Sequence, residues 1–156
     1  MSGLSHVTGS GEAHMVDVSA KAVTVRSATA CGRISVNPQA LAAIAEGSIA
    51  KGDVLATARI AGIMAAKRTA DIIPLCHPLP LASVSIDIAP DTTGIDVSAT
   101  ARTAAQTGVE MEAMTAATAT LLTLYDMLKA LDKRMVIGDV RVTEKRGGKS
   151  GDWTAP

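Results

Sequence analysis

The sequence predicts an α+β sandwich in which two long helices cover one face of an antiparallel sheet. Apolar and polar residues alternate in several short segments, as they do in strands with one buried and one solvated face. Two of these segments, 82–88 and 94–101, flank the turn sequence PDTTG and predict a hairpin. Two longer segments carry helix signals and are long enough to cover a sheet. This combination favours a ferredoxin-like sandwich.

The first third of the chain predicts two strands and a short helix. The strands cover 22–28 and 33–37, with valine or isoleucine on one face of each. A helix should follow from Asn37 to Gly47, because asparagine caps a helix, the next proline suits its first turn and glycine can end it.

A second helix is predicted from Val54 to about Ala70, with Asp53 as its cap. Lys67 lies near its end, where a cation interacts favourably with the helix dipole. Gly62, in the interior of this helix, indicates close packing against a neighbour.

The segment DIIPLCHPLP at 71–80 restricts the backbone around His77, because each proline fixes its own φ angle and restrains the residue before it. The segment either aims a functional side chain or simply links a helix to a strand. The hairpin comes next, and the residues expected on its buried face are Val84, Ile86, Ile88, Ile95, Val97 and Ala99. A long helix from Val109 to Leu131, a strand at 136–145 and a glycine-rich tail complete the prediction.

Composition limits the possible functions. With 156 residues and 47% hydrophobic composition, the chain fits one domain, expected as a flexible segment at 1–14 and a single globular domain at 15–156. Phenylalanine is absent and only Tyr125 and Trp153 are aromatic, which argues against stacking on single-stranded nucleic acid. The formal net charge is zero, so an anionic ligand needs a local basic cluster.

The two cysteines, Cys31 and Cys76, form neither a disulfide framework nor a metal motif, which favours a reducing cytoplasm. No apolar stretch approaches the roughly 18 residues of a membrane span, so no membrane partner is expected. The tail GGKSG lacks the first glycine and the following helix of a nucleotide P-loop, and Cys76 with His77 offers too few ligands for zinc.

The long helix separates apolar from polar residues. Its predicted core stripe contains Leu121, Leu124, Tyr125, Leu128 and Leu131, and its polar side contains Glu112, Thr115, Thr123 and Asp126. A solvated helix face is the simplest interpretation of the polar side. Glu112 and Asp126 lie about 21 Å apart along the axis and cannot form a carboxylate pair in one subunit. They could instead lie at two ends of a long ligand, or belong to two sites completed by neighbouring subunits.

Two cationic positions suggest further chemistry. Asp126 and Lys129 are three residues apart, so they form either a surface ion pair or a pair that handles protons. Lys51 precedes Gly52 in a loop just before a helix, where a phosphate would find free backbone donors and the positive end of the dipole. An exposed loop lysine with no function is the alternative.

Six segments together resemble one family. They are EAHMVDVSAK at 12–21, KGDVLATARIAGIMAAKRT at 51–69, IPLCHPL at 73–79, TGVEMEAMTAAT at 107–118, YDMLKA at 125–130 and the tail GGKSGDW. The chain resembles the cyclic pyranopterin monophosphate synthase (MoaC) family of molybdenum cofactor biosynthesis from about residue 11 onward. The resemblance implies a ferredoxin-like lyase that assembles as a homohexamer, a trimer of dimers, with its active site at a subunit interface.

The family's substrate is 3',8-cyclo-7,8-dihydroguanosine 5'-triphosphate, made by an upstream radical SAM enzyme and converted into cyclic pyranopterin monophosphate with release of pyrophosphate. By resemblance, the catalytic residues fall on Asp126, Lys51 and Lys129. The substrate-binding residues fall on Leu75, Cys76, His77, Met111 and Glu112, with Lys21, Arg26, Lys67 and Lys149 as weaker candidates for the triphosphate. No metal ligand is implied, although magnesium could accompany the triphosphate.

This chemistry gives the residues expected roles. Cations would stabilise the charge that grows on the leaving pyrophosphate. Asp126, Lys129 and Lys51 are candidates for acid and base, since a lysine crowded by other cations has a lowered pKa and can act as a base. Two other classes remain open at this point: a non-catalytic module that senses nucleotides through its basic loops, and a magnesium-dependent phosphohydrolase acting on GTP.

Overall fold

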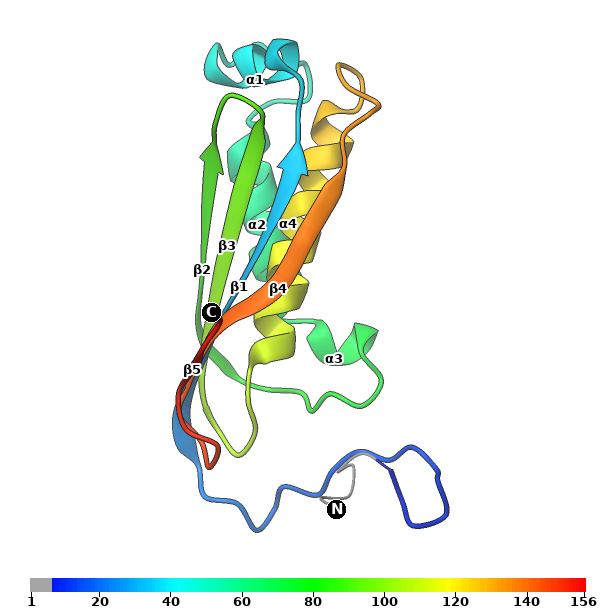
Figure 1. Cartoon of the computed structure of the whole chain (residues 1–156), viewed down its shortest axis with the longest axis vertical. Helices are drawn as coiled ribbons and strands as arrows, with labels where there is room; N and C mark the ends of the chain where they lie inside the picture. Colours follow the sequence, from blue (N-terminus) through cyan, green and yellow to red (C-terminus); the bar gives the residue numbers. More distant parts are fainter. Residues whose placement is uncertain (1–6) are drawn as a thin grey trace.

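The computed structural model describes residues 7–156 and contains a five-stranded antiparallel sheet with helices on one face (Figure 1). The strand order is β2-β3-β1-β4-β5. The strands are β1 (Thr24–Ser35), β2 (Leu81–Pro90), β3 (Gly94–Ala105), β4 (Ile137–Arg146) and β5 (Trp153–Thr154). With one helical crossover after β1 and another after β3, the first four strands follow the ferredoxin-like order, which confirms the predicted fold.

Helices α2 (Val54–Ala66) and α4 (Glu110–Leu128) lie side by side over the same face of the sheet, as predicted. The short helices α1 (Pro38–Ala45) and α3 (Thr69–Ile72) lie near opposite ends of this layer (Figure 1). Both predicted N-caps are present: Asn37 Oδ1 accepts the N–H of Ala40 at 2.8 Å, and Asp53 Oδ1 accepts that of Ala56 at 2.9 Å. These caps satisfy backbone donors that the first turn leaves free.

The predicted ends of the two long helices are wrong by a few residues. Helix α2 stops at Ala66, not Ala70, because the chain turns at its C-cap residue Lys67 and restarts as α3. Helix α4 stops at Leu128, and Leu131, expected in the core stripe, is 37% exposed beyond it.

Strand β1 corrects a second expectation, since 22–28 and 33–37 are not two strands but belong largely to one. Its buried face carries Ala28, Ala30, Gly32 and Ile34, and the valines that suggested a buried face at 22–28 are exposed. A Cβ at Gly32 would lie 2.6 Å from Leu121 Cδ1 of α4, so a glycine lets the helix approach the sheet closely.

The predicted hairpin is confirmed, with β2 and β3 joined at 91–93 and the expected apolar residues facing the core. Asp91 Oδ1 accepts the N–H groups of Thr93 and Gly94 in this turn. Arg33 from β1 pairs with Asp91 and with Asp96, each at 2.9 Å, and this guanidinium lowers the pKa of the Asp91 carboxyl well below its usual range.

The core lies between the sheet and the two long helices, where Ile34, Ile95, Val97, Leu121, Leu124 and Leu128 are fully buried. Strand β5 pairs with Glu144 and Lys145 of β4 and was not predicted. The segment predicted as flexible, 1–14, lies partly outside the described residues; within it, 7–13 forms a turn closed by a bridge between Val7 and Ala13. No helix of the described chain is long and apolar enough to span a membrane.

Candidate functional site

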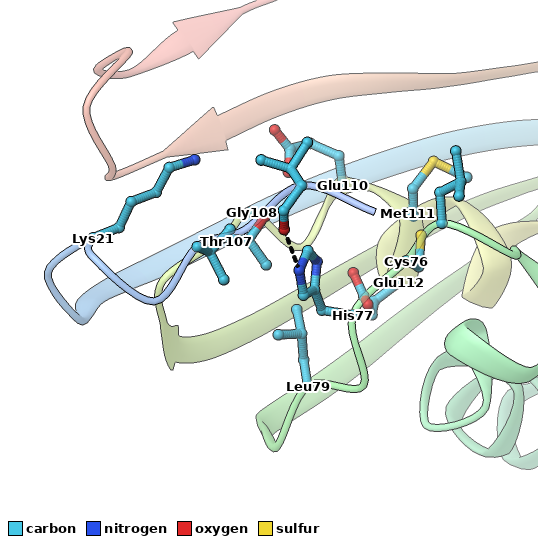
Figure 2. A pocket seen from close by; sticks show the side chains of 12 residues that line it. Lys21, Cys76, His77, Leu79, Thr107, Gly108, Glu110, Met111 and Glu112 are labelled. Atoms are coloured by element: carbon cyan, nitrogen blue, oxygen red, sulfur yellow. Dashed lines mark hydrogen bonds between the residues drawn. The ribbon is translucent and has the colours of Figure 1, made fainter. Parts of the chain in front are cut away.

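A cavity of about 310 Å³ lies at the N-terminal end of α4 (Figure 2). Its walls come from the first turn of α4, the proline-rich segment after α3 and residues 16–21 of the N-terminal region. Six of the nine predicted substrate-binding residues line it: Lys21, Leu75, Cys76, His77, Met111 and Glu112. The sequence analysis did not assign the other wall residues, which include Val16, Val18, Thr107, Gly108 and Glu110.

Glu112 is not on a solvated helix face, contrary to the simplest interpretation of the helix pattern, and is only 4% exposed. The helical wheel misplaced it because the first turn of α4 forms a wall of the cavity beside the proline-rich segment. Burial raises the pKa of the Glu112 carboxyl, and the nearby Glu110 adds to the effect. A buried carboxyl with a raised pKa in a cavity is typical of a group that exchanges protons with a ligand.

His77 is held at the centre of the cavity wall. Its Nε2 lies 2.8 Å from the backbone carbonyl oxygen of Val16 (Figure 2). A carbonyl oxygen only accepts, so Nε2 carries a proton. Cys76, the residue before His77, has a thiol pKa raised by burial and then by the charge of Glu112, so it is a poor nucleophile here. The proline-rich segment thus places His77 in the wall of the cavity.

The three predicted catalytic residues meet at the other end of α4. Lys51 Nζ donates to the backbone oxygen of Asp126 at 2.8 Å and to its Oδ2 at 3.0 Å. Lys129 Nζ lies 2.7 Å from Oδ1 of the same carboxylate. The loop before α2 thus brings Lys51 to the last turn of α4, where cations are favoured by the helix dipole.

The protonation states in this group differ from the expectation of a lysine crowded by cations. The lysines share a carboxylate, which raises the pKa of Lys129. Hydrogen bonds from Lys129 and then from Lys51 lower the pKa of Asp126. All three side chains are exposed, so the ion pairs hold the geometry and contribute little to stability. The raised pKa of Lys129 in this arrangement disfavours its use as a base.

Arg26 lines a smaller recess of about 90 Å³, which shares Gly108 and Glu110 with the cavity. Lys145 lies in the same recess and donates to Glu110 at 3.3 Å and to Ser150 at 2.9 Å. The sequence analysis chose Lys149 instead, which is an exposed turn residue lining neither hollow. Lys145 could have been chosen from the sequence, because it lies at the end of a segment whose alternating pattern predicts a strand.

Two placements limit what one chain can do. The cavity and the Lys51–Asp126–Lys129 group lie at opposite ends of α4, about 21 Å apart along its axis, so they do not meet within a chain. Lys67 is exposed at the end of α2 and lines neither hollow. Among the described residues, no cluster of histidine, cysteine and carboxylate side chains could hold a metal ion.

Comparison with known proteins adds an independent observation. The model of the MoaC family matches residues 15–148. A cyclic pyranopterin monophosphate synthase of Brucella ovis is 58% identical over 156 residues, covering 98% of this chain and 94% of the relative. The protein of the same name from Parvibaculum lavamentivorans is 57% identical over 154 residues, covering 97% of this chain and 96% of the relative. The sequence segments, the ferredoxin-like fold and the similarity over nearly the whole length agree, and the chain belongs to the MoaC family.

Proposed function

We propose that the chain is a cyclic pyranopterin monophosphate synthase, a lyase that converts 3',8-cyclo-7,8-dihydroguanosine 5'-triphosphate into cyclic pyranopterin monophosphate and pyrophosphate. The similarity of 57–58% to relatives of that name carries the proposal. We place the reaction in the cytoplasm, early in molybdenum cofactor biosynthesis and after a radical SAM enzyme that makes the substrate.

The charges near the cavity suit the phosphoryl part of this reaction. An oxygen of the sugar-derived part of the substrate forms a bond to the α-phosphorus, and the bond from that phosphorus to the bridging oxygen breaks. Pyrophosphate leaves with the electron pair, and cations aimed at it lower the barrier. Lys21 at the cavity and Arg26 with Lys145 in the adjoining recess are placed to contact the triphosphate. Magnesium is expected only as a companion of the triphosphate.

The ring rearrangement needs several proton transfers, and the chain offers suitable groups at both ends of α4. Glu112 can exchange a proton, because its pKa is raised by burial. Asp126 is ionised at neutral pH and can accept one, while Lys51 and Lys129 beside it can donate. These roles are the ones we assign to the predicted catalytic residues.

We place the complete active site between two chains of a homohexamer built as a trimer of dimers. The separation of the two groups along α4 supports this, because one compact ligand cannot contact both ends of that helix in the same chain. One chain would contribute its cavity, and its neighbour would contribute Lys51, Asp126 and Lys129.

The activity is tested by incubating the protein with the cyclised GTP derivative, oxidising the product and measuring the fluorescent pterin together with pyrophosphate. We expect equal amounts of the two. Binding of the nucleotide with neither product would favour the sensing module, and release of phosphate from GTP itself would favour the phosphohydrolase.

Mixing two inactive variants tests the shared site. We expect Lys51→Ala and His77→Ala each to lose turnover almost completely while the fold is kept. In an assembly formed from equal amounts of both after dissociation, one site in four receives an intact half from each chain, so about a quarter of wild-type activity should return. Lys133→Ala, which removes an exposed lysine just beyond α4, is the matched control and should keep its rate. Mixtures that stay inactive would contradict a site built from two chains.

A further inference from the structure

Residues 16–21, which we call the strap, cross the cavity and are held at two points. His77 Nε2 donates to the carbonyl oxygen of Val16 at 2.8 Å. Gln106 Nε2 donates to the carbonyl oxygens of Lys21 at 3.0 Å and of Ser19 at 3.3 Å. The amide group of glutamine has two N–H donors, and both carbonyls can only accept, so the whole donor capacity of Gln106 is directed to the strap.

The strap has its own local structure between these two points. The N–H of Ser19 donates to Asp17 Oδ1 at 2.8 Å, and the N–H of Lys21 donates to the carbonyl oxygen of Val18 at 2.9 Å. The first of these bonds lowers the pKa of the Asp17 carboxyl. Two consecutive turns of this kind are marginal when isolated from the rest of a fold. The two turns of the strap therefore depend on the hydrogen bonds that His77 and Gln106 donate to it.

Gln106 is itself fixed from the other side. Arg26 in β1 donates its Nε to the carbonyl oxygen of Ala105 at 3.1 Å and one Nη to that of Gln106 at 3.3 Å. The backbone of Gln106 is thus tied to the sheet just after β3 ends, and its side chain reaches outward to the strap. This single residue joins the recess that contains Arg26 to the segment that carries Lys21.

We infer that Gln106 is a positioning residue, which acts through the strap to fix Lys21 beside the cavity. Figure 2 shows Lys21 and Glu112 on opposite sides of the His77 ring, so the strap decides whether a cation stands across the cavity from the buried carboxyl. The kinetic part of this inference rests on the proposed function, and the structural part does not.

The expected effect follows from the two hydrogen bonds. Each neutral hydrogen bond changes an equilibrium constant by a factor of about five, so removing both should shift the strap toward its undocked state by more than tenfold. Lys21 is one of the cations proposed to stabilise the charge that grows on the triphosphate, so moving it away lowers transition-state stabilisation. We therefore expect kcat/KM for the triphosphate to fall about tenfold.

Gln106→Met is the test, because methionine keeps the length of glutamine and removes its donors. The readout is hydrogen–deuterium exchange, followed by mass spectrometry, in a peptide that contains the Ser19 and Lys21 amides. We expect exchange of these amides to be more than tenfold faster, with unchanged exchange in α4. Gln39→Met, which changes the chain's other glutamine, exposed in α1, is the matched control and should exchange as the wild type does.

A second variant separates the donor from general packing. Gln106→Lys restores N–H donors at the same position, so it should recover most of the protection that Gln106→Met loses. If both variants exchange as the wild type does, or if lysine is no better than methionine, Gln106 does not position the strap.

The exchange result is independent of any turnover. If the wild-type protein has no synthase activity but Gln106→Met loses strap protection, the inference is supported and the proposed function is refuted. If the wild-type protein is active but Gln106→Met keeps normal strap protection, the proposed function is supported and the inference is refuted.

Discussion

Replacing Gly62 with alanine should weaken the packing of α2 against α4. A Cβ at this position would overlap Thr120 Oγ1 and Ile86 Cδ1, and it would lie 2.9 Å from the carbonyl oxygen of Ala116. Side chains can move, but the backbone oxygen of Ala116 is fixed by α4. Because three atoms lie too close, overpacking here should cost about 2–3 kcal/mol, and the higher helix propensity of alanine offsets about 1 kcal/mol. The net destabilisation expected is about 1–2 kcal/mol.

Thermal unfolding at a fixed protein concentration measures this effect, because assembly couples to stability. For a chain of this length, we expect a melting temperature about 2–8 °C lower. Gly138→Ala is the matched control, since a Cβ there meets nothing within 4 Å, and it should leave the melting temperature nearly unchanged. Adding Thr120→Ala to Gly62→Ala should recover part of the loss, because the two sites are coupled. A Gly62→Ala protein at least as stable as the wild type would refute the reasoning.

Two further predictions concern carboxylates with shifted pKa values. Because burial raises the pKa of Glu112, this carboxyl destabilises the fold at pH values above its ordinary value of 4.5, and the full cost is reached above the raised pKa. Glu112→Gln should therefore raise the melting temperature at pH 7–8 while lowering turnover. The gain should shrink as the pH falls from the raised pKa to 4.5 and be absent below it. A lower melting temperature at pH 8 would mean that the carboxylate has a stabilising partner. Because Arg33 and the turn lower the pKa of Asp91, its contribution is present above the ordinary value of 3.8 and is lost as the pH falls through the folded-state pKa. Asp91→Asn should therefore melt below the wild type at pH 6–8, and the deficit should diminish in acid; a deficit that persists unchanged in acid would contradict an electrostatic origin.

The parts of the fold predicted correctly are those with strong local signals. The hairpin has alternation on both sides of a turn sequence, and each N-cap is an Asn or Asp whose side chain bonds the backbone within its own turn. Strand β1 was misread because its buried face at 28–32 is alanine and glycine, which carry little hydrophobic signal, and the strong apolar residue that covers it, Leu121, lies on another element. Strand β5 has two residues and no periodicity to detect.

The sequence could indicate which residues belong to the site, but not how they are arranged or buried. The resemblance to a family supplied Lys51, Asp126 and Lys129, and the structure places them in one group. Sequence patterns did not indicate that Glu112 is buried, because the segments around the cavity come from distant parts of the chain. Gln106 had no signal at all, since its role depends on two backbone carbonyls more than eighty residues away.

The proton on Nε2 of His77 restricts which ligand groups can approach this ring. When the ring is neutral and the carbonyl of Val16 holds that proton, Nδ1 has only a lone pair, so any group that hydrogen-bonds to it must be a donor. An ionised Glu112 in the same cavity has the same preference. The amino and ring N–H groups of a guanine-derived heterocycle satisfy both, and phosphate oxygens satisfy neither. We therefore expect a bound substrate to place its heterocycle inside the cavity and its phosphate tail outward, toward the cations.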